Sequence, residues 1–331
     1  MGRNHVRVWD EAVEGVELVA VADPESEAVL RASHGRTVRG YASAEEMLAL
    51  ESLDLLSIVV PTSLHLPIAL AALEAGTHIL VEKPIAATRE EAEQMIAAAN
   101  RAARTLTVGH VERFNPAILE LRRRLRANEL GRIFEVRATR LGPFPARIRD
   151  VGVVVDLAPH DLDIMRFLLG SDPVRLYAET EQRIHTDHED LFVGLMKFDN
   201  GAVGVLDINW LTPTKVRTLS VTGERGMYVA DYLAQDLVFY GNPDATPPSS
   251  ASAAAPTLAS VAEGKMTRRV IHRQEPLVME LTEFARAVRE SAPPPVDPHE
   301  AMVALLLARA MVESARSGRV IAGEELRQVL A

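Results

Sequence analysis

The first 110 residues alternate between short apolar runs and amphipathic stretches of helical length. Apolar runs predict strands over Val16–Ala22, Leu53–Val60, Thr77–Val81 and Leu106–Gly109, and the stretches between them predict helices over Glu25–His34, Ser43–Leu50, Ser63–Ala75 and Thr88–Ala103. Continuous apolar runs rich in β-branched residues are typical of parallel strands that are covered on both faces. Strands that alternate with helices in this way indicate βαβ units, so we predict a Rossmann-type parallel sheet.

The pattern changes after residue 110, where longer alternating segments follow one another with fewer helices between them. Strands are predicted over Ile133–Arg140, Leu191–Phe198, Ala202–Trp210, Val216–Thr222, Met227–Asp231 and Leu237–Tyr240, and helices over Pro116–Arg126, Val154–Leu169, Pro276–Ser291 and Pro298–Ser317. Asp199-Asn200-Gly201 favours a hairpin, and Asn242–Glu263 has the composition of a loop. We therefore predict an α/β protein with a Rossmann domain over residues 1–110 and an α+β domain over 111–331, whose open sheet is mostly antiparallel.

The chain begins where a dinucleotide-binding fold has its first helix. Such a fold opens with a strand, a glycine-rich turn and then that helix. Gly2 matches the third glycine of the turn, and its distance along the chain from Asp23 fits the roughly 20-residue spacing of the fold. We therefore expect the first strand and two glycines to be missing through a misassigned start, which would impair phosphate binding. Alternatively, Gly2 only follows the initiator methionine.

Composition narrows the classes of function. The chain of 331 residues has a formal net charge of −10, which disfavours nucleic acid and anionic membrane surfaces as partners. It contains no cysteine, so disulfides and thiolate metal sites are excluded. The sequence has no apolar run of the roughly 18–20 residues that span a bilayer, and no signal-peptide pattern at its start. We therefore expect a cytoplasmic protein that acts on a small molecule.

Asp23 stands at the end of the second expected strand of the fold. An acid at this position accepts hydrogen bonds from the adenosine ribose and repels a 2′-phosphate, which favours NAD over NADP. Arg31 and Arg36 lie close enough in sequence to leave NADP open. An ordinary Asp-Pro turn with Pro24 is the alternative interpretation.

Polar residues also follow two later strands. Pro61-Thr62-Ser63-Leu64-His65 comes after one apolar run, and Glu82-Lys83-Pro84 after the next. Ligands of doubly wound sheets bind outside the carboxyl ends of the strands. Lys83 would hydrogen-bond a substrate hydroxyl there and stabilise an alkoxide as hydride leaves. A solvated loop lysine is the alternative.

Asp156 and His160 are four residues apart, so they share one face of the predicted helix. Histidine suits the acceptance of a hydroxyl proton near neutral pH, and a neighbouring carboxylate orients its ring. A structural, hydrogen-bonded histidine is the alternative. A metal is not expected, because neither this segment, with Asp161 and Asp163, nor the cluster from His185 to Asp190 has a ligand motif.

Three ordered segments resemble the motifs of one oxidoreductase family. Ala72–Pro84 (ALEAGTHILVEKP) resembles the AL-x-AGKHVL-x-EKP segment of the glucose–fructose oxidoreductase / inositol dehydrogenase (Gfo/Idh/MocA) family. Gly109–Pro116 (GHVERFNP) is similar to its G-x-x-x-R-F-x-P motif, and Asp156–Asp163 (DLAPHDLD) to its D-x-G-x-H-x-x-D motif. Ala158 stands where the third motif has glycine. The matches run through nearly the whole chain.

The resemblance implies site residues and partners. It implies a reaction centre of Lys83, Asp156 and His160, a nicotinamide site lined by Pro61, Thr62, His65 and Glu82, and an Arg113 near the substrate or the nicotinamide. It also implies a homodimer or homotetramer that assembles through the C-terminal sheet. The stretch Val108–Ala117 resembles members that oxidise the 3-hydroxyl of UDP-N-acetylglucosamine or related nucleotide sugars.

These observations favour an NAD-dependent dehydrogenase that transfers a hydride between a sugar hydroxyl and nicotinamide. One alternative is a redox-neutral glycosidase-type enzyme that uses bound NAD transiently. Another is a nucleotide-binding sensor without catalysis, since a fold alone does not determine function. Because a sensor has no need of Lys83, Asp156 and His160 together, the site favours an enzyme.

Overall fold

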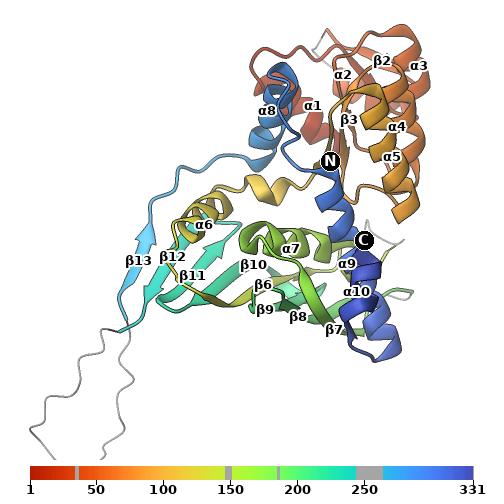
Figure 1. Ribbon diagram of the computed structural model, residues 1–331. Coiled ribbons are helices and arrows are strands. Elements are labelled where there is room, and N and C mark those ends of the chain that lie inside the picture. The colour runs from red at the N-terminus through yellow and green to blue at the C-terminus, as the bar shows by residue number, and fades with distance from the viewer. Residues whose placement is uncertain (34–36, 146–150, 185–186, 244–263, 331) are drawn as a thin grey trace, which may run out of the picture.

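The computed structural model describes residues 1–331 except 34–36, 146–150, 185–186, 244–263 and 331. His185, and the predicted loop of Asn242–Glu263 from residue 244 onward, lie outside the described residues. The described chain has two parts, one built on short parallel strands and the other on one large sheet (Figure 1).

The parallel strands confirm the predicted α/β organisation. They form two sheets, one of β1 (Ala20–Ala22) and β2 (Arg39–Tyr41), the other of β3 (Leu55–Ile58), β4 (His78–Glu82) and β5 (Leu106–Gly109). The helices of this part are α1 (Gly2–Glu11), α2 (Ser26–Ser33), α3 (Ala44–Leu50), α4 (His65–Glu74) and α5 (Arg89–Ala102), with a 3₁₀ turn η1 (Thr62–Leu64) before α4. The short strand β2 was not predicted, and β1 is shorter than the predicted Val16–Ala22.

Side-chain caps explain why two of these helices begin where they do. The Ser43 side chain accepts a hydrogen bond from the backbone N–H of Glu46 at the start of α3. Thr88 and Glu91 form a reciprocal capping box at the start of α5. These caps fix the helix starts locally, before any tertiary contact is needed.

The second part is a nine-stranded sheet in the order β13-β12-β11-β10-β6-β9-β8-β7-β14. Its strands are β6 (Ile133–Pro143), β7 (Pro173–Glu181), β8 (Leu191–Phe198), β9 (Val203–Asn209), β10 (Leu211–Gly223), β11 (Gly226–Asp231), β12 (Asp236–Gly241), β13 (Met266–Arg269) and β14 (Ile321–Ala322). Its strands pair antiparallel except for β6 with β9, which confirms the predicted mostly antiparallel sheet. The edge strands β13 and β14 were not predicted.

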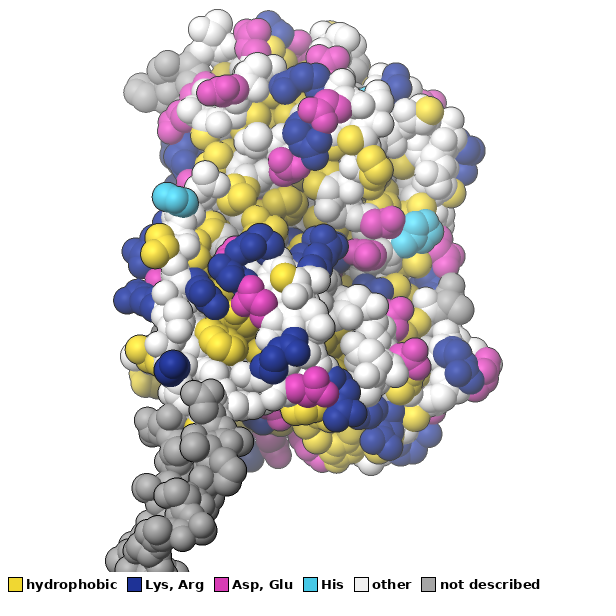
Figure 2. Space-filling model, turned by 60° about the vertical axis from the view of Figure 1, so that its left-hand side comes forward, with side chains coloured by type: hydrophobic (Ala, Val, Ile, Leu, Met, Phe, Trp, Pro, Cys, Tyr) yellow, Lys and Arg dark blue, Asp and Glu magenta, His cyan; other side chains and the backbone are white. Residues whose placement is uncertain are grey.

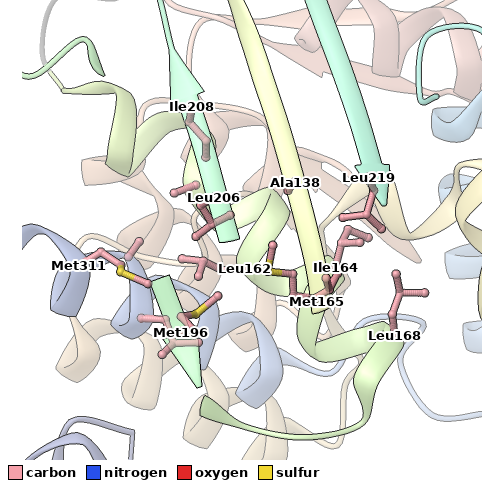
Figure 3. Packing of buried hydrophobic residues seen from close by; sticks show 14 of the residues in the cluster. Ala138, Leu162, Ile164, Met165, Leu168, Met196, Leu206, Ile208, Leu219 and Met311 are labelled. Carbon is pink, nitrogen blue, oxygen red and sulfur yellow. The ribbon is translucent and has the colours of Figure 1, made fainter. Parts of the chain in front are cut away.

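Helices cover one face of this sheet, between it and the parallel strands (Figure 1). They include α6 (Pro116–Arg126) and α7 (Val153–Leu169), and the chain closes with α9 (Pro298–Ser317) and α10 (Gly323–Leu330). Leu162 and Met165 of α7 pack against Leu206 and Ile208 of β9 in a core from which water is excluded (Figure 3). This packing fixes the rotation of α7 about its axis.

The C-terminal helices also pack on the first part of the chain. Leu277 and Phe284 of α8 (Pro276–Arg289) share a core with Val8 of α1 and Leu80 of β4. Met302 of α9 joins the core of the β3-β4-β5 sheet. The boundary after residue 110 therefore stays a prediction, and helices on both sides of it hold the two parts together. None of the helices in the described part of the chain is long and apolar enough to cross a membrane.

Candidate active site

The carboxyl ends of β3 and β4 are braced by His65, at the start of α4. The His65 ring is buried, with Nε2 lying 3.0 Å from the Val60 carbonyl oxygen and Nδ1 lying 3.0 Å from that of Pro84. Both nitrogens thus face backbone carbonyl oxygens, and the neutral ring donates to one of them at a time. His65 therefore holds the two strand-end loops together, with Pro61 and Thr62 in one loop and Lys83 in the other.

Lys83 reaches from the end of β4 to the first turn of α7. Its Nζ donates to the Asp156 carbonyl oxygen at 2.8 Å and lies 3.1 Å from Asp156 Oδ1. Both side chains keep 18% of their surface exposed. The two residues are 73 positions apart in sequence and come from different parts of the fold. The structure thus brings together two of the three predicted reaction-centre residues, with access from solvent.

The third residue, His160, lies on the same face of α7 as Asp156. Asp156, His160 and Asp163 follow one another at helical spacings of four and three residues, away from the apolar face that packs on the sheet. Burial, and then the positive charges of Lys83 and Arg140, lower the pKa of His160 well below its ordinary value. The ring is therefore neutral at pH 7. Its Nδ1 is buried and has no hydrogen-bond partner among the described residues.

Arg113, which follows β5, lies in a buried ion-pair network. Its guanidinium donates to both oxygens of Asp163 at 2.7 and 2.6 Å, and its Nη1 lies 2.6 Å from Glu300 of α9. The side chain is 5% exposed. His110 Nδ1 lies 3.6 Å from Asp163 Oδ2 in the same network. Arg113 therefore links the end of β5 to α7 and α9 through ion pairs.

Glu82, which was predicted to line the nicotinamide site, is the last residue of β4 and directly precedes Lys83. Its carboxylate is 2.9 Å from His5 Nε2 of α1 and accepts the backbone N–H of Lys83 at 3.3 Å. The opposite residue on β5 is Gly109, where a Cβ would come within about 3.1 Å of that carboxylate. Glycine there leaves room for the Glu82 side chain. Glu82 therefore helps to position Lys83 through its hydrogen bond with the Lys83 backbone.

The residues predicted for the adenosine half lie further away, on the edge of the first part. Asp23 directly follows β1 and is half-buried, and its Oδ1 accepts the backbone N–H of Glu25 at 2.8 Å. The other carboxylate oxygen makes no hydrogen bond within the described chain. Gly2 begins α1, and a Cβ built there meets no atom within 4 Å, so the described residues give no steric reason for glycine.

A second group of charges lies beside His160 on the large sheet. Arg140 of β6 is buried and donates to both oxygens of Asp161 at 2.7 and 3.1 Å, and to Glu112 at 3.2 Å. Arg217 of β10 stands next to Arg140 in the strand register. The Tyr232 ring lies 5.6 Å from the Arg140 guanidinium. Apart from Asp161, sequence reasoning did not single out these side chains, because only the pairing of β6 with β10 brings them to α7.

The surface between the two parts of the molecule is hollowed when seen from the side of α8 and β13 (Figure 2). Hydrophobic side chains lie in the hollow, and Lys and Arg side chains gather along its lower edge. This local positive character contrasts with the net charge of −10 of the whole chain. A cleft of this kind attracts anionic ligands.

Two family profiles match the sequence. Residues 1–110 match the NAD-binding Rossmann fold of the GFO/IDH/MocA oxidoreductase family. Residues 118–229 match the GFO/IDH/MocA C-terminal domain.

Individual relatives agree with the profiles. The UDP-N-acetylglucosamine 3-dehydrogenase of Acidithiobacillus ferrooxidans is 32% identical over 224 residues, which are 68% of this chain and 69% of that protein. Its solved structure superimposes with a TM-score of 0.82 at 27% identity and covers 96% of this chain and 94% of that chain. The D-apiose dehydrogenase of Paraburkholderia graminis is 31% identical over 339 residues, covering 96% of this chain and 86% of that protein.

Proposed function

Because the chain belongs to the GFO/IDH/MocA oxidoreductase family, we propose that it oxidises a hydroxyl of a sugar or nucleotide sugar with NAD as hydride acceptor. The family assignment makes it an NAD(P)-dependent dehydrogenase. The contact of Lys83 with Asp156, beside a neutral His160, is the observation that carries the proposed reaction.

The residues present fit the cofactor. The unshared oxygen of Asp23 suits the adenosine ribose hydroxyls, and the N–H groups of Gly2 and Arg3 at the start of α1 would face the pyrophosphate, whereas those of Asn4 and His5 donate to Met1. Pro61, Thr62 and Glu82 would flank the nicotinamide ring at the strand ends. When it is bound, the cofactor supplies the carbon that accepts hydride.

The protein side of the reaction then follows from the site. A substrate hydroxyl placed between Lys83 Nζ and His160 would give its proton to His160 Nε2, and bound NAD would supply the acceptor for the hydride that leaves the same carbon. The carbinol becomes a carbonyl, so proton and hydride both have an acceptor. The Lys83 ammonium stabilises the negative charge that develops on oxygen. Asp156 fixes the position of that ammonium through the 3.1 Å contact.

We propose that the substrate is UDP-N-acetylglucosamine or a related nucleotide sugar, and that the group oxidised is its 3-hydroxyl. The similarity to a dehydrogenase of that name over about two thirds of the chain supports this choice. We further propose a homodimer or homotetramer that assembles through the large sheet. The sheet face opposite α7 supports this, since Val193, Leu195 and Val203 are exposed there.

The variant Lys83→Met tests the proposed function. Removing the ammonium while keeping the length of the side chain should lower kcat with UDP-N-acetylglucosamine by at least about 100-fold, because the oxyanion loses its stabilising charge. Binding of NADH, followed by fluorescence, should change little. The exposed Lys265 provides the matched control, and Lys265→Met should keep wild-type turnover. Undiminished turnover in Lys83→Met would reject the assignment.

A further inference from the structure

Arg217 is a cation beside the reaction centre that the proposed chemistry does not use. It lies on β10 directly opposite Arg140 of β6, and the two side chains share the sheet face that α7 covers. The Arg217 side chain keeps 35% of its surface exposed, whereas that of Arg140 keeps 4%. Arg217 is therefore the member of this pair that a ligand can reach.

The acids of this region are already bonded to other cations. Asp161 and Glu112 accept hydrogen bonds from Arg140, and Asp156 accepts one from Lys83. Among the described residues, Arg217 has one ionic contact, in which Nη1 lies 3.7 Å from Glu112 Oε1, too far for a hydrogen bond. Its guanidinium makes no hydrogen bond within the described chain. Five N–H donors thus remain for a ligand.

Arg217 is also close enough to the reaction centre to act on it. Its positive charge is one of those that lower the pKa of His160, and the charge of Asp156 acts on Arg217 in turn. The neighbouring Tyr232 donates its backbone N–H to the Arg217 carbonyl at 3.0 Å, and its buried hydroxyl has no hydrogen-bond partner among the described residues. Unused polar groups therefore gather on the sheet side of the site.

We propose that Arg217 is a specificity-determining residue that binds an anionic group, a phosphate or a carboxylate, carried by the sugar substrate. This inference rests on the proposed function and names the class of its substrate. A planar guanidinium pairs with two oxygens of such a group at once. An anion held there also offsets the positive charge that His160 gains when it accepts the hydroxyl proton.

The experiment compares sugars that share a 3-hydroxyl and differ in charge. UDP-N-acetylglucosamine and glucose 1-phosphate carry phosphate, glucuronate carries a carboxylate, and methyl glucoside is neutral. Steady-state NADH formation gives kcat and KM for each sugar. Calorimetry with the NADH-bound protein gives the affinity for each sugar independently of turnover.

The variants are Arg217→Met and Arg217→Lys, with Arg316→Met as matched control. Arg316 is exposed on α9 and pairs with Glu313, away from the site. Arg217→Met should raise KM and weaken calorimetric binding of the preferred charged sugar by about 10- to 100-fold, as expected for a lost charge-assisted hydrogen bond. Methyl glucoside should change less than about twofold. Arg217→Lys should recover part of the loss because it retains the charge.

The pH dependence of kcat/KM tests whether the Arg217 charge acts on the reaction centre or whether Arg217 has only a structural role. Removing the Arg217 charge should raise the pKa of His160, so the acid limb of kcat/KM for methyl glucoside should move to higher pH in Arg217→Met. The limb should stay in place in Arg316→Met.

Two results would overturn the inference. One is a wild type that binds methyl glucoside as tightly as every charged sugar, and the other is an Arg217→Met variant that weakens charged and neutral sugars alike. Preference for phosphate over carboxylate, or the reverse, identifies the anion. Absence of NADH formation with all four sugars would instead reject the proposed function, while calorimetry would still test Arg217.

Discussion

At the scale of single residues, the environment of His160 makes a prediction about pH. Burial and the cations Lys83 and Arg140 disfavour the protonated ring. The base form should therefore persist well below the usual histidine pKa of about 6.5. The acid limb of kcat/KM should lie below that pH. In His160→Gln the limb should disappear and kcat should fall by about 100- to 10,000-fold. His272→Gln, which changes an exposed histidine, is the control. A limb at or above pH 6.5 in the wild type would contradict the assignment.

Glu280 of α8 makes a second residue-scale prediction. Its side chain is fully buried, and neither carboxylate oxygen has a hydrogen-bond partner among the described residues. Burial, and then the charge of Glu82, raise the pKa of Glu280 well above its ordinary value. The folded protein therefore holds a proton that the unfolded chain releases above the usual glutamate pKa of about 4.3, so this residue costs stability as pH rises.

Glu280→Gln removes that titration at nearly constant shape. The Tm of the variant should exceed that of the wild type at pH 8, and the difference should shrink towards zero at pH 5. Differential scanning fluorimetry across this pH range measures both values. Glu283→Gln, on the same helix at a position where the side chain is 40% exposed, should show no such trend. A Tm difference that is independent of pH would contradict the predicted protonation.

At the scale of elements, helix starts that depend on local capping were predicted better than short strands at sheet edges. The starts of α5 and α6 were predicted correctly because the Thr88 capping box and the Asn115 cap each act within a few residues. The strands β2 and β13 were missed because each is a short strand at a sheet edge, and its pairing depends on a partner far along the chain. Arg113 was expected near the ligand, and the acids that pair with it, the buried Asp163 and the exposed Glu300, come from α7 and α9.

The Arg113–Asp163 pair links β5 to α7, so its loss should destabilise the fold. Asp163→Asn leaves a buried cation with a weakened partner and should cost about 3–5 kcal/mol of unfolding free energy. Asp172→Asn is the matched control, because Asp172 pairs with Arg166 at an exposed position, and it should cost less than about 1 kcal/mol. Urea unfolding followed by circular dichroism measures both. Equal losses in the two variants would contradict the proposed link.

At the scale of the whole molecule, the sequence predicted which segments carry chemistry but not all of their neighbours. Lys83 and Asp156 were expected to meet because the family resemblance implies one reaction centre for both, and Lys83 follows a strand end, where ligands of such sheets bind. Arg217 was not expected, because its position depends on the register of β10 against β6, which no local pattern specifies. His5 and Glu280 were missed for the same reason, since they approach Glu82 only through the packing of α1 and α8.

The exposed face of the large sheet is the basis of a prediction about the proposed oligomer. Leu195 and Val193 of β8 are 48% and 41% exposed on the face opposite α7, and Val203 of β9 is also exposed there. If two copies meet through this face, Leu195→Lys buries a charge in the interface and should shift the protein towards monomer in sedimentation velocity. Leu50→Lys changes an exposed leucine on α3 and should leave the sedimentation coefficient unchanged. A wild type that sediments as a monomer would reject the proposed assembly, and an oligomer unaffected by Leu195→Lys would place the interface elsewhere.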